Sequence, residues 1–181
     1  MFGKLTLDAL PLYSAIAAGG AAVTVGGALL VAIVLTWLKA WKYLWTEWLT
    51  SVDHKRIGIM YIVLALIMLL RGFVDAIMMR AQQAMALNSG GYLPPEHFDQ
   101  IFSSHGTIMI FFVAIPLVTG IINFVMPLQI GARDVAFPYL NNLAFWLTAA
   151  GAALVMASLF IGEFSTAGWL NYVPVSNLQN S

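Results

Sequence analysis

Cysteine is absent from this 181-residue sequence, and charged residues make up only 9% of it, against 61% hydrophobic residues. Without cysteine, disulfide bonds and thiolate metal sites are excluded, so a metal or haem iron would have to be held by histidine. Soluble domains carry roughly a quarter charged residues. The shortage of charge predicts an integral membrane protein embedded in a lipid bilayer, and no basic surface indicates nucleic acid as a partner.

Four segments are apolar and long enough to cross a bilayer, which takes about 20 helical residues. They predict an all-α, polytopic transmembrane helix bundle with four spans. A signal peptide is the alternative for the first segment, but its apolar core is usually shorter and its start more basic. The expected spans are residues 12–37, 57–79, 98–126 and 140–161.

Local signals mark where these spans begin and end. Ser51 or Asp53 is expected to cap the second span. Residues 81–95 are expected to form a loop, and Pro94-Pro95 to begin the third span, because proline is tolerated in a first helical turn. Pro127 is expected to end that span.

Basic residues are distributed unequally between the two predicted membrane sides, and the richer side is usually cytoplasmic. Five of them lie on one side and two on the other. The N-terminus and the 81–95 loop are therefore expected outside. The inner residues are Lys39, Lys42, Lys55, Arg56 and Arg133, and the outer ones are Lys4 and Arg80.

Four polar residues are expected near the outer membrane level on two consecutive spans. Arg71 and Asp75 are one helical turn apart, as are His97 and Gln100. An internal ion pair that serves structure alone is one interpretation of the first two. The other is a pocket for the two oxygens of a quinone, in which Asp75 or His97 accepts protons and Arg71 stabilises negative charge.

His105 lies about 12 Å deeper than His97 along the same helix, at 1.5 Å per residue. Either it hydrogen-bonds a neighbouring carbonyl, or it is a cofactor ligand, with Gly106 allowing a flat macrocycle to approach. His54 stands among charged residues and is expected to be solvated and not a ligand.

Three polar residues, Asn123, Asp134 and Asn141, are expected at the inner end. A proton-uptake path can begin with a carboxylate at an aqueous mouth, followed by amides that order water. From composition alone, the ordinary interpretation is favoured: an asparagine cap and a solvated loop carboxylate.

Three stretches together carry a specific resemblance: Trp48–Gly58 (WLTSVDHKRIG), Ser104–Phe112 (SHGTIMIFF) and Pro127–Pro138 (PLQIGARDVAFP). The sequence resembles subunit I of the haem-copper terminal oxidases from about Leu5 to Val175. Arg71, Asp75, His97 and Gln100 make it similar to the bo-type ubiquinol oxidase branch, which carries an extra first span.

The resemblance implies a proton-pumping enzyme of the bacterial inner (plasma) membrane that oxidises ubiquinol and reduces oxygen to water together with other subunits. It assigns His105 as an axial ligand of low-spin haem b and the four outer residues to the ubiquinol site. It also makes Asp134 the mouth of the D pathway for protons, with Asn123 and Asn141 as its amides, which reverses the ordinary interpretation above.

Family members have a dozen or more spans, so this chain is expected to be an N-terminal fragment of one membrane domain. The resemblance places the second haem b ligand, the high-spin haem and copper on later helices, and the fragment alone is expected to be inactive. One alternative is the same region of a cytochrome c oxidase, which would lack the polar outer pocket. Another is a stand-alone haem or quinone protein, which would normally need two deep histidines on facing helices.

Overall fold

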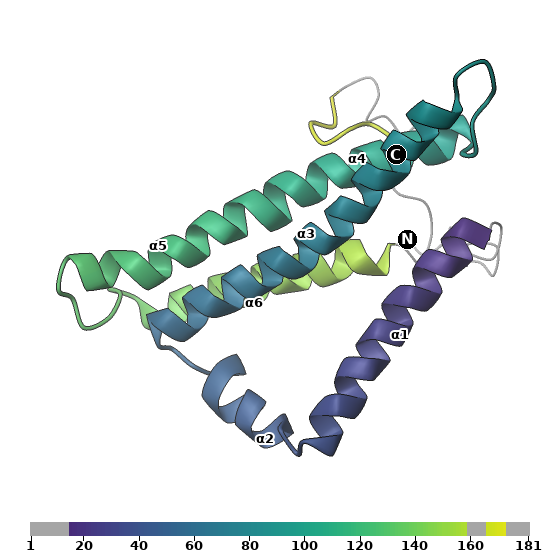
Figure 1. Cartoon of the computed structure of the whole chain (residues 1–181). Helices are drawn as coiled ribbons and strands as arrows, with labels where there is room; N and C mark the ends of the chain where they lie inside the picture. The colour runs from purple at the N-terminus through teal and green to yellow at the C-terminus, as the bar shows by residue number, and fades with distance from the viewer. Residues whose placement is uncertain (1–14, 159–165, 173–181) are drawn as a thin grey trace, which may run out of the picture. The chain divides into compact units, whose positions relative to one another are not determined.

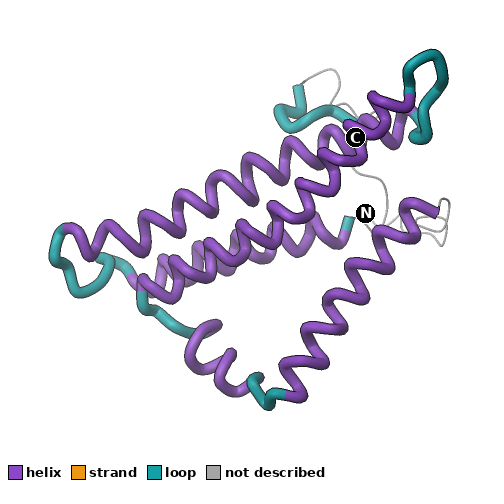
Figure 2. The backbone as a smooth tube through the Cα atoms, in the orientation of Figure 1, coloured by secondary structure: helices purple, strands orange, loops and turns teal. Residues whose placement is uncertain are grey.

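The computed structural model describes residues 15–158 and 166–172. Within these residues the chain forms helices joined by loops, with no strand (Figure 2). Two of the elements, η2 and η3, are π-helical. In chain order (Figure 1) the elements are α1 (Ala15–Trp37), α2 (Trp41–Tyr43), η2 (Leu44–Leu49), α3 (His54–Met85), α4 (Pro95–Thr107), η3 (Ile108–Ala114), α5 (Ile115–Gln129) and α6 (Pro138–Ala157).

Among the described residues, four helices are long and apolar enough to cross a membrane, which confirms the predicted all-α class with four spans. The third is continuous through α4, η3 and α5. Residues 12–14 of the first expected span and 159–161 of the fourth lie outside the described residues. The four helices are Ala18–Trp37, His54–Met85, Pro95–Gln129 and Pro138–Ala157.

The start of α3 follows the local signals. The Asp53 carboxylate accepts a hydrogen bond from the backbone N–H of Lys55 at 2.9 Å, and the Asp53 carbonyl accepts from Ile57 at 3.0 Å. Ser51 supports the turn by accepting from the N–H of Asp53 at 3.3 Å. Asp53 is therefore the cap, because its side chain satisfies a donor that the first turn leaves free.

Two helix ends differ from the expectation. Helix α3 continues to Met85, so the loop begins several residues later than predicted, because Ala81-Gln-Gln-Ala-Met consists of good helix formers. Pro127 lies inside α5 and does not end it. The helix ends at Gln129, and Gly131 closes it: the N–H of Gly131 bonds the carbonyl of Leu128, and the N–H of Ala132 bonds that of Pro127. With φ at +67° for Gly131, this is a Schellman ending.

Proline has a different effect at the middle of the third span. The π-helical segment Ile108–Ala114 immediately precedes Ile115 and Pro116. Pro116 has no N–H to donate to the preceding turn, and its ring crowds the carbonyl there. The widened π turn lies where this disruption falls, and Pro116 itself is fully buried.

The chain divides into two compact units. One comprises residues 1–60 and 122–163, and the other comprises residues 61–121 and 164–181. In the first unit, α6 holds the segment before α3 through two side chains: Asn142 donates to the Ser51 carbonyl at 2.7 Å, and Trp146 donates to the Leu49 carbonyl at 3.0 Å. These bonds fix the chain where it enters α3.

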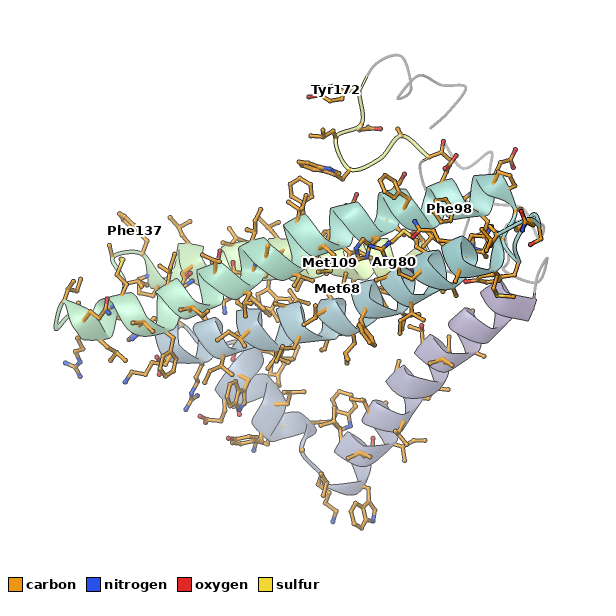
Figure 3. All side chains as sticks on the ribbon, turned by 45° about the horizontal axis from the view of Figure 1, so that its top comes forward. Met68, Arg80, Phe98, Met109, Phe137 and Tyr172 are labelled. Carbon is orange, nitrogen blue, oxygen red and sulfur yellow. The ribbon has the colours of Figure 1, made fainter. Side chains whose placement is uncertain are left out.

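In the second unit, α3 packs against the α4–η3 helix along a buried stripe. The stripe repeats every three or four residues, the spacing of one helical face. At Gly72 the helices come close, since a Cβ there would lie 2.7 Å from the Met109 sulfur. Met68 and Met109, both labelled in Figure 3, belong to this region. The buried residues of α3 in this unit include Tyr61, Ala65, Met68, Gly72 and Asp75.

Candidate functional site

Asp75 continues the buried stripe of α3, although the residues before it are apolar or small. Its side chain is 1% exposed, and it forms an ion pair with Arg71, whose side chain is 15% exposed. Removing a carboxylate from water is costly unless an opposite charge compensates it. Arg71 therefore makes this buried carboxylate possible, and the predicted neighbours do meet.

His97 and Gln100 lie on the first turns of α4, and both are half-buried. His97 begins the helical row that continues through Ile101, Ser104 and Ile108, which are buried. The structure places all four predicted outer residues in one unit, on two consecutive helices, and it joins two of them directly as the Arg71–Asp75 pair.

His105 is anchored by the backbone of α3. Its Nδ1 lies 3.0 Å from the carbonyl oxygen of Gly72, and the ring is half-buried. A hydrogen bond at this position makes Nδ1 the protonated nitrogen and leaves Nε2 as the nitrogen with a free lone pair. Histidines that bind metals are usually oriented in this way, with the second ring nitrogen donating to a carbonyl.

Gly106, beside His105, has a different neighbour from the one expected. A Cβ at this position would lie 3.1 Å from the Cβ of Trp169. The same segment is held by the buried hydroxyl of Ser103, which accepts a hydrogen bond from the N–H of Gly168 at 2.9 Å. In this structure Gly106 therefore gives room to Trp169.

The expectation that His54 is solvated was wrong. Its residue exposure is 2%, and its Nδ1 lies 3.1 Å from Oδ1 of Asp134, whose side chain is 38% exposed. The two residues are far apart in sequence, so no local pattern relates them. The carboxylate of the loop after α5 replaces the water that His54 would otherwise have bound.

The two predicted asparagines lie on the helices that flank the loop carrying Asp134. Asn123 is half-buried on α5, and Asn141 lies in the first turn of α6. The Asn141 amide nitrogen is buried and has no hydrogen-bond partner among the described residues, as is also true of Nε2 of His54. Buried polar atoms of this kind commonly bind ordered water.

Sequence reasoning missed the contribution of His54 to this inner cluster. The position of His54 directly after the Asp53 cap was one signal. A residue at this position is held close to the helix and can be buried by a segment that covers that end. The direction of approach of the 130–137 loop was not available from the sequence.

Comparison with known proteins gives a family match. The profile of the family described as "Cytochrome C and Quinol oxidase polypeptide I" matches residues 56–180, which is more than half of the chain.

Several curated relatives are similar over the whole chain. The chain is 58% identical to "Cytochrome bo(3) ubiquinol oxidase subunit 1" of Buchnera aphidicola subsp. Schizaphis graminum, covering 28% of that protein. It is 60% identical to "Ubiquinol oxidase subunit 1" of Acetobacter aceti, covering 27%. It is also 60% identical to "Probable cytochrome c oxidase subunit 1" of Bradyrhizobium diazoefficiens, covering 27%. The chain thus spans little more than a quarter of the length of these relatives.

Proposed function

Because the chain belongs to the cytochrome c and quinol oxidase polypeptide I family, we propose that it is the N-terminal part of subunit I of a proton-pumping ubiquinol oxidase. The complete enzyme would oxidise ubiquinol, reduce oxygen to water and work with further subunits in the bacterial plasma membrane. This region would supply the quinol site, one haem ligand and the entrance for protons. The high-spin haem and copper would be held by residues beyond this region.

The buried Arg71–Asp75 pair is the observation that carries the quinol assignment. Ubiquinol is apolar and arrives through the lipid, so its site needs polar groups set into an otherwise apolar helix surface. Asp75 is the proton acceptor in this proposal, and Arg71 and Gln100 hold and polarise the oxygens. His97 relays the proton toward the outer side, where a proton-motive enzyme should release it.

His105 fits a low-spin haem b ligand because its Nδ1 is engaged by the Gly72 carbonyl and Nε2 keeps its lone pair. The haem, when bound, would supply one-electron transfer between the quinol site and the oxygen-reducing centre. In this role the Gly72 carbonyl fixes the orientation and the tautomer of the ring. The hydrogen bond to a carbonyl and the ligand role are therefore compatible.

Asp134 is proposed as the mouth of the proton path because its carboxylate is partly exposed while the side chain that it contacts, His54, is buried. The buried, unsatisfied nitrogens of Asn141 and His54 among the described residues are positions where water would bind. Asn123 lies farther along α5 and would continue the path. This end would face the cytoplasm, in keeping with the predicted excess of basic residues there.

The decisive test is Asp75→Asn in the complete subunit, with Asp99→Asn as the matched control. Asp99 lies on α4 but is exposed. We expect ubiquinol oxidation by Asp75→Asn to fall roughly ten- to a hundred-fold, the effect of losing a charge-assisted hydrogen bond. The low-spin haem spectrum should persist, and the control should keep parental turnover. Parental turnover in Asp75→Asn would leave Arg71–Asp75 as a structural ion pair.

A cytochrome c oxidase is the second candidate, because the similar Bradyrhizobium protein has that name. The buried Arg71–Asp75 pair favours quinol, since a water-soluble electron donor needs no polar group inside the membrane. Purified enzyme should therefore oxidise ubiquinol and not reduced cytochrome c, and the opposite preference would establish the second candidate.

A further inference from the structure

We propose that Gln82 is a positioning residue for the quinol site, fastening the loop of residues 86–94 to α3 and thereby setting the position of the first turns of α4. The inference rests on the proposed function, because it concerns the same four polar residues. Gln82 bonds the backbone of this loop, and in this inference it acts through the loop.

The side-chain amide of Gln82 bonds the loop backbone with both of its ends. Its Oε1 accepts the N–H groups of Tyr92 at 2.8 Å and Leu93 at 2.9 Å. Its Nε2 donates to the carbonyls of Gly90 at 3.2 Å and Leu93 at 3.4 Å. An amide offers two donors and two acceptor lone pairs, so one side chain is fully used to hold one loop.

The loop is shaped to receive this amide. Gly91 has a φ of +71°, and a Cβ on it would lie 2.3 Å from Nε2 of Gln82. Tyr92 adds a second attachment, donating its hydroxyl to the carbonyl of Met78 at 2.7 Å. Burial raises the pKa of the Tyr92 hydroxyl, so it keeps the proton that it donates. Leu93, at the end of the loop, is 4% exposed.

This attachment lies on the same face of α3 as the quinol residues. Positions 71, 75, 78 and 82 follow the three- and four-residue spacing of a single helical face. On the other side of Asp75 along α3, the helix is tied to α4 where the Gly72 carbonyl meets His105. The two attachments therefore bracket Asp75 on α3 and the first turns of α4, where His97 and Gln100 lie.

The two attachments hold different parts of α4. The His105 bond holds the inner part of α4, and the Gln82 amide holds its start. Without Gln82, the first turns of α4 can shift relative to Asp75 while His105 remains in place. Such a shift should weaken quinol binding without removing the proton acceptor or the haem ligand.

The test is Gln82→Ala in the complete oxidase, compared with Gln83→Ala. Gln83 is the neighbouring glutamine; it is exposed, and its side-chain oxygen accepts a hydrogen bond from Arg80 at 2.9 Å. We expect the KM for ubiquinol to rise about tenfold in Gln82→Ala, the equivalent of one or two hydrogen bonds, with a smaller change in kcat. The low-spin haem spectrum should be unchanged, and Gln83→Ala should match the parent.

A second variant approaches the same contact from the loop. Gly91→Ala places a methyl group against the Gln82 amide and should raise KM similarly. Because both changes break one contact, the double variant should be less impaired than the two effects combined would predict. A parental KM in Gln82→Ala overturns the positioning role. So does loss of the haem spectrum together with quinol affinity, because Gln82 would then support the fold in general.

The failure of this inference is distinguishable from that of the proposed function. An unchanged KM in Gln82→Ala beside a defective Asp75→Asn enzyme overturns only the positioning role. Parental turnover in Asp75→Asn overturns the quinol site itself.

Discussion

Two of the acid–base contacts among the described residues, Arg71–Asp75 and His54–Asp134, are buried in opposite ways. In Arg71–Asp75 the carboxylate is the buried member, with 1% of the side chain exposed. In His54–Asp134 the histidine is buried, with 3% of its side chain exposed, and the carboxylate is 38% exposed. Water can replace the lost partner of Asp134, but it cannot readily reach Asp75.

The two pairs consequently suit different chemistry. A buried carboxylate that depends on one arginine can take a proton from an apolar substrate out of contact with water. A partly exposed carboxylate that rests on a buried imidazole can exchange protons with the aqueous phase. A carboxylate in contact with a basic side chain is thus suited to different tasks, depending on which member of the pair is buried.

Of the three variants considered, we expect the largest effect, a loss of stability, for Arg71→Met. This variant leaves Asp75 as an uncompensated buried charge, which typically costs about 3–5 kcal/mol. We expect the complete subunit to lose its haem absorbance at a clearly lower temperature in detergent. The double variant Arg71→Met, Asp75→Leu should recover most of this stability, because it removes both charges. Parental thermal stability in the single variant would show that water reaches Asp75.

An intermediate effect is expected for Asp134→Asn. Asparagine keeps the size and a hydrogen bond to His54 but cannot carry a proton, so oxygen-linked turnover should fall by roughly a hundred-fold, the lower end of what a positioned proton-transfer group contributes. The KM for ubiquinol should stay close to the parental value. Proton uptake by the enzyme in sealed vesicles is the measurement, and unaltered uptake would return Asp134 to the role of a loop carboxylate.

His54→Phe should have the smallest effect of the three. The ring volume is retained, one hydrogen bond is lost, and water can solvate Asp134, so the expected loss of stability is about 0.5–1.5 kcal/mol. Turnover should fall less than in Asp134→Asn when both are assayed side by side. A greater loss of turnover in His54→Phe would make the histidine itself a carrier of protons.

The features that could be predicted from the sequence depend on residues close together in the chain. The Asp53 cap, the proline start of α4 and the Arg71–Asp75 pair each involve residues within one helical turn, where geometry follows from spacing. The four spans follow from composition and length in the same way.

What could not be predicted depends on the direction in which loops approach. His54 and Asp134 are separated by 80 positions, and the Gln82 contacts require a positive φ at Gly91. No helical spacing shows that a glutamine near the end of α3 will meet the loop backbone. The end of α5 was misassigned for a related reason: proline is the more familiar signal, but Gly131 makes the bonds that close the helix.

The hydrogen bond between His105 and Gly72 determines how substitutions at position 72 can act. Its acceptor is a main-chain carbonyl, which every amino acid carries, so no substitution at position 72 can delete it. A change there can act through volume, since a Cβ at position 72 would lie 2.7 Å from the Met109 sulfur and would force that side chain to move. Selection can therefore preserve the orientation of this histidine simply by keeping one residue small.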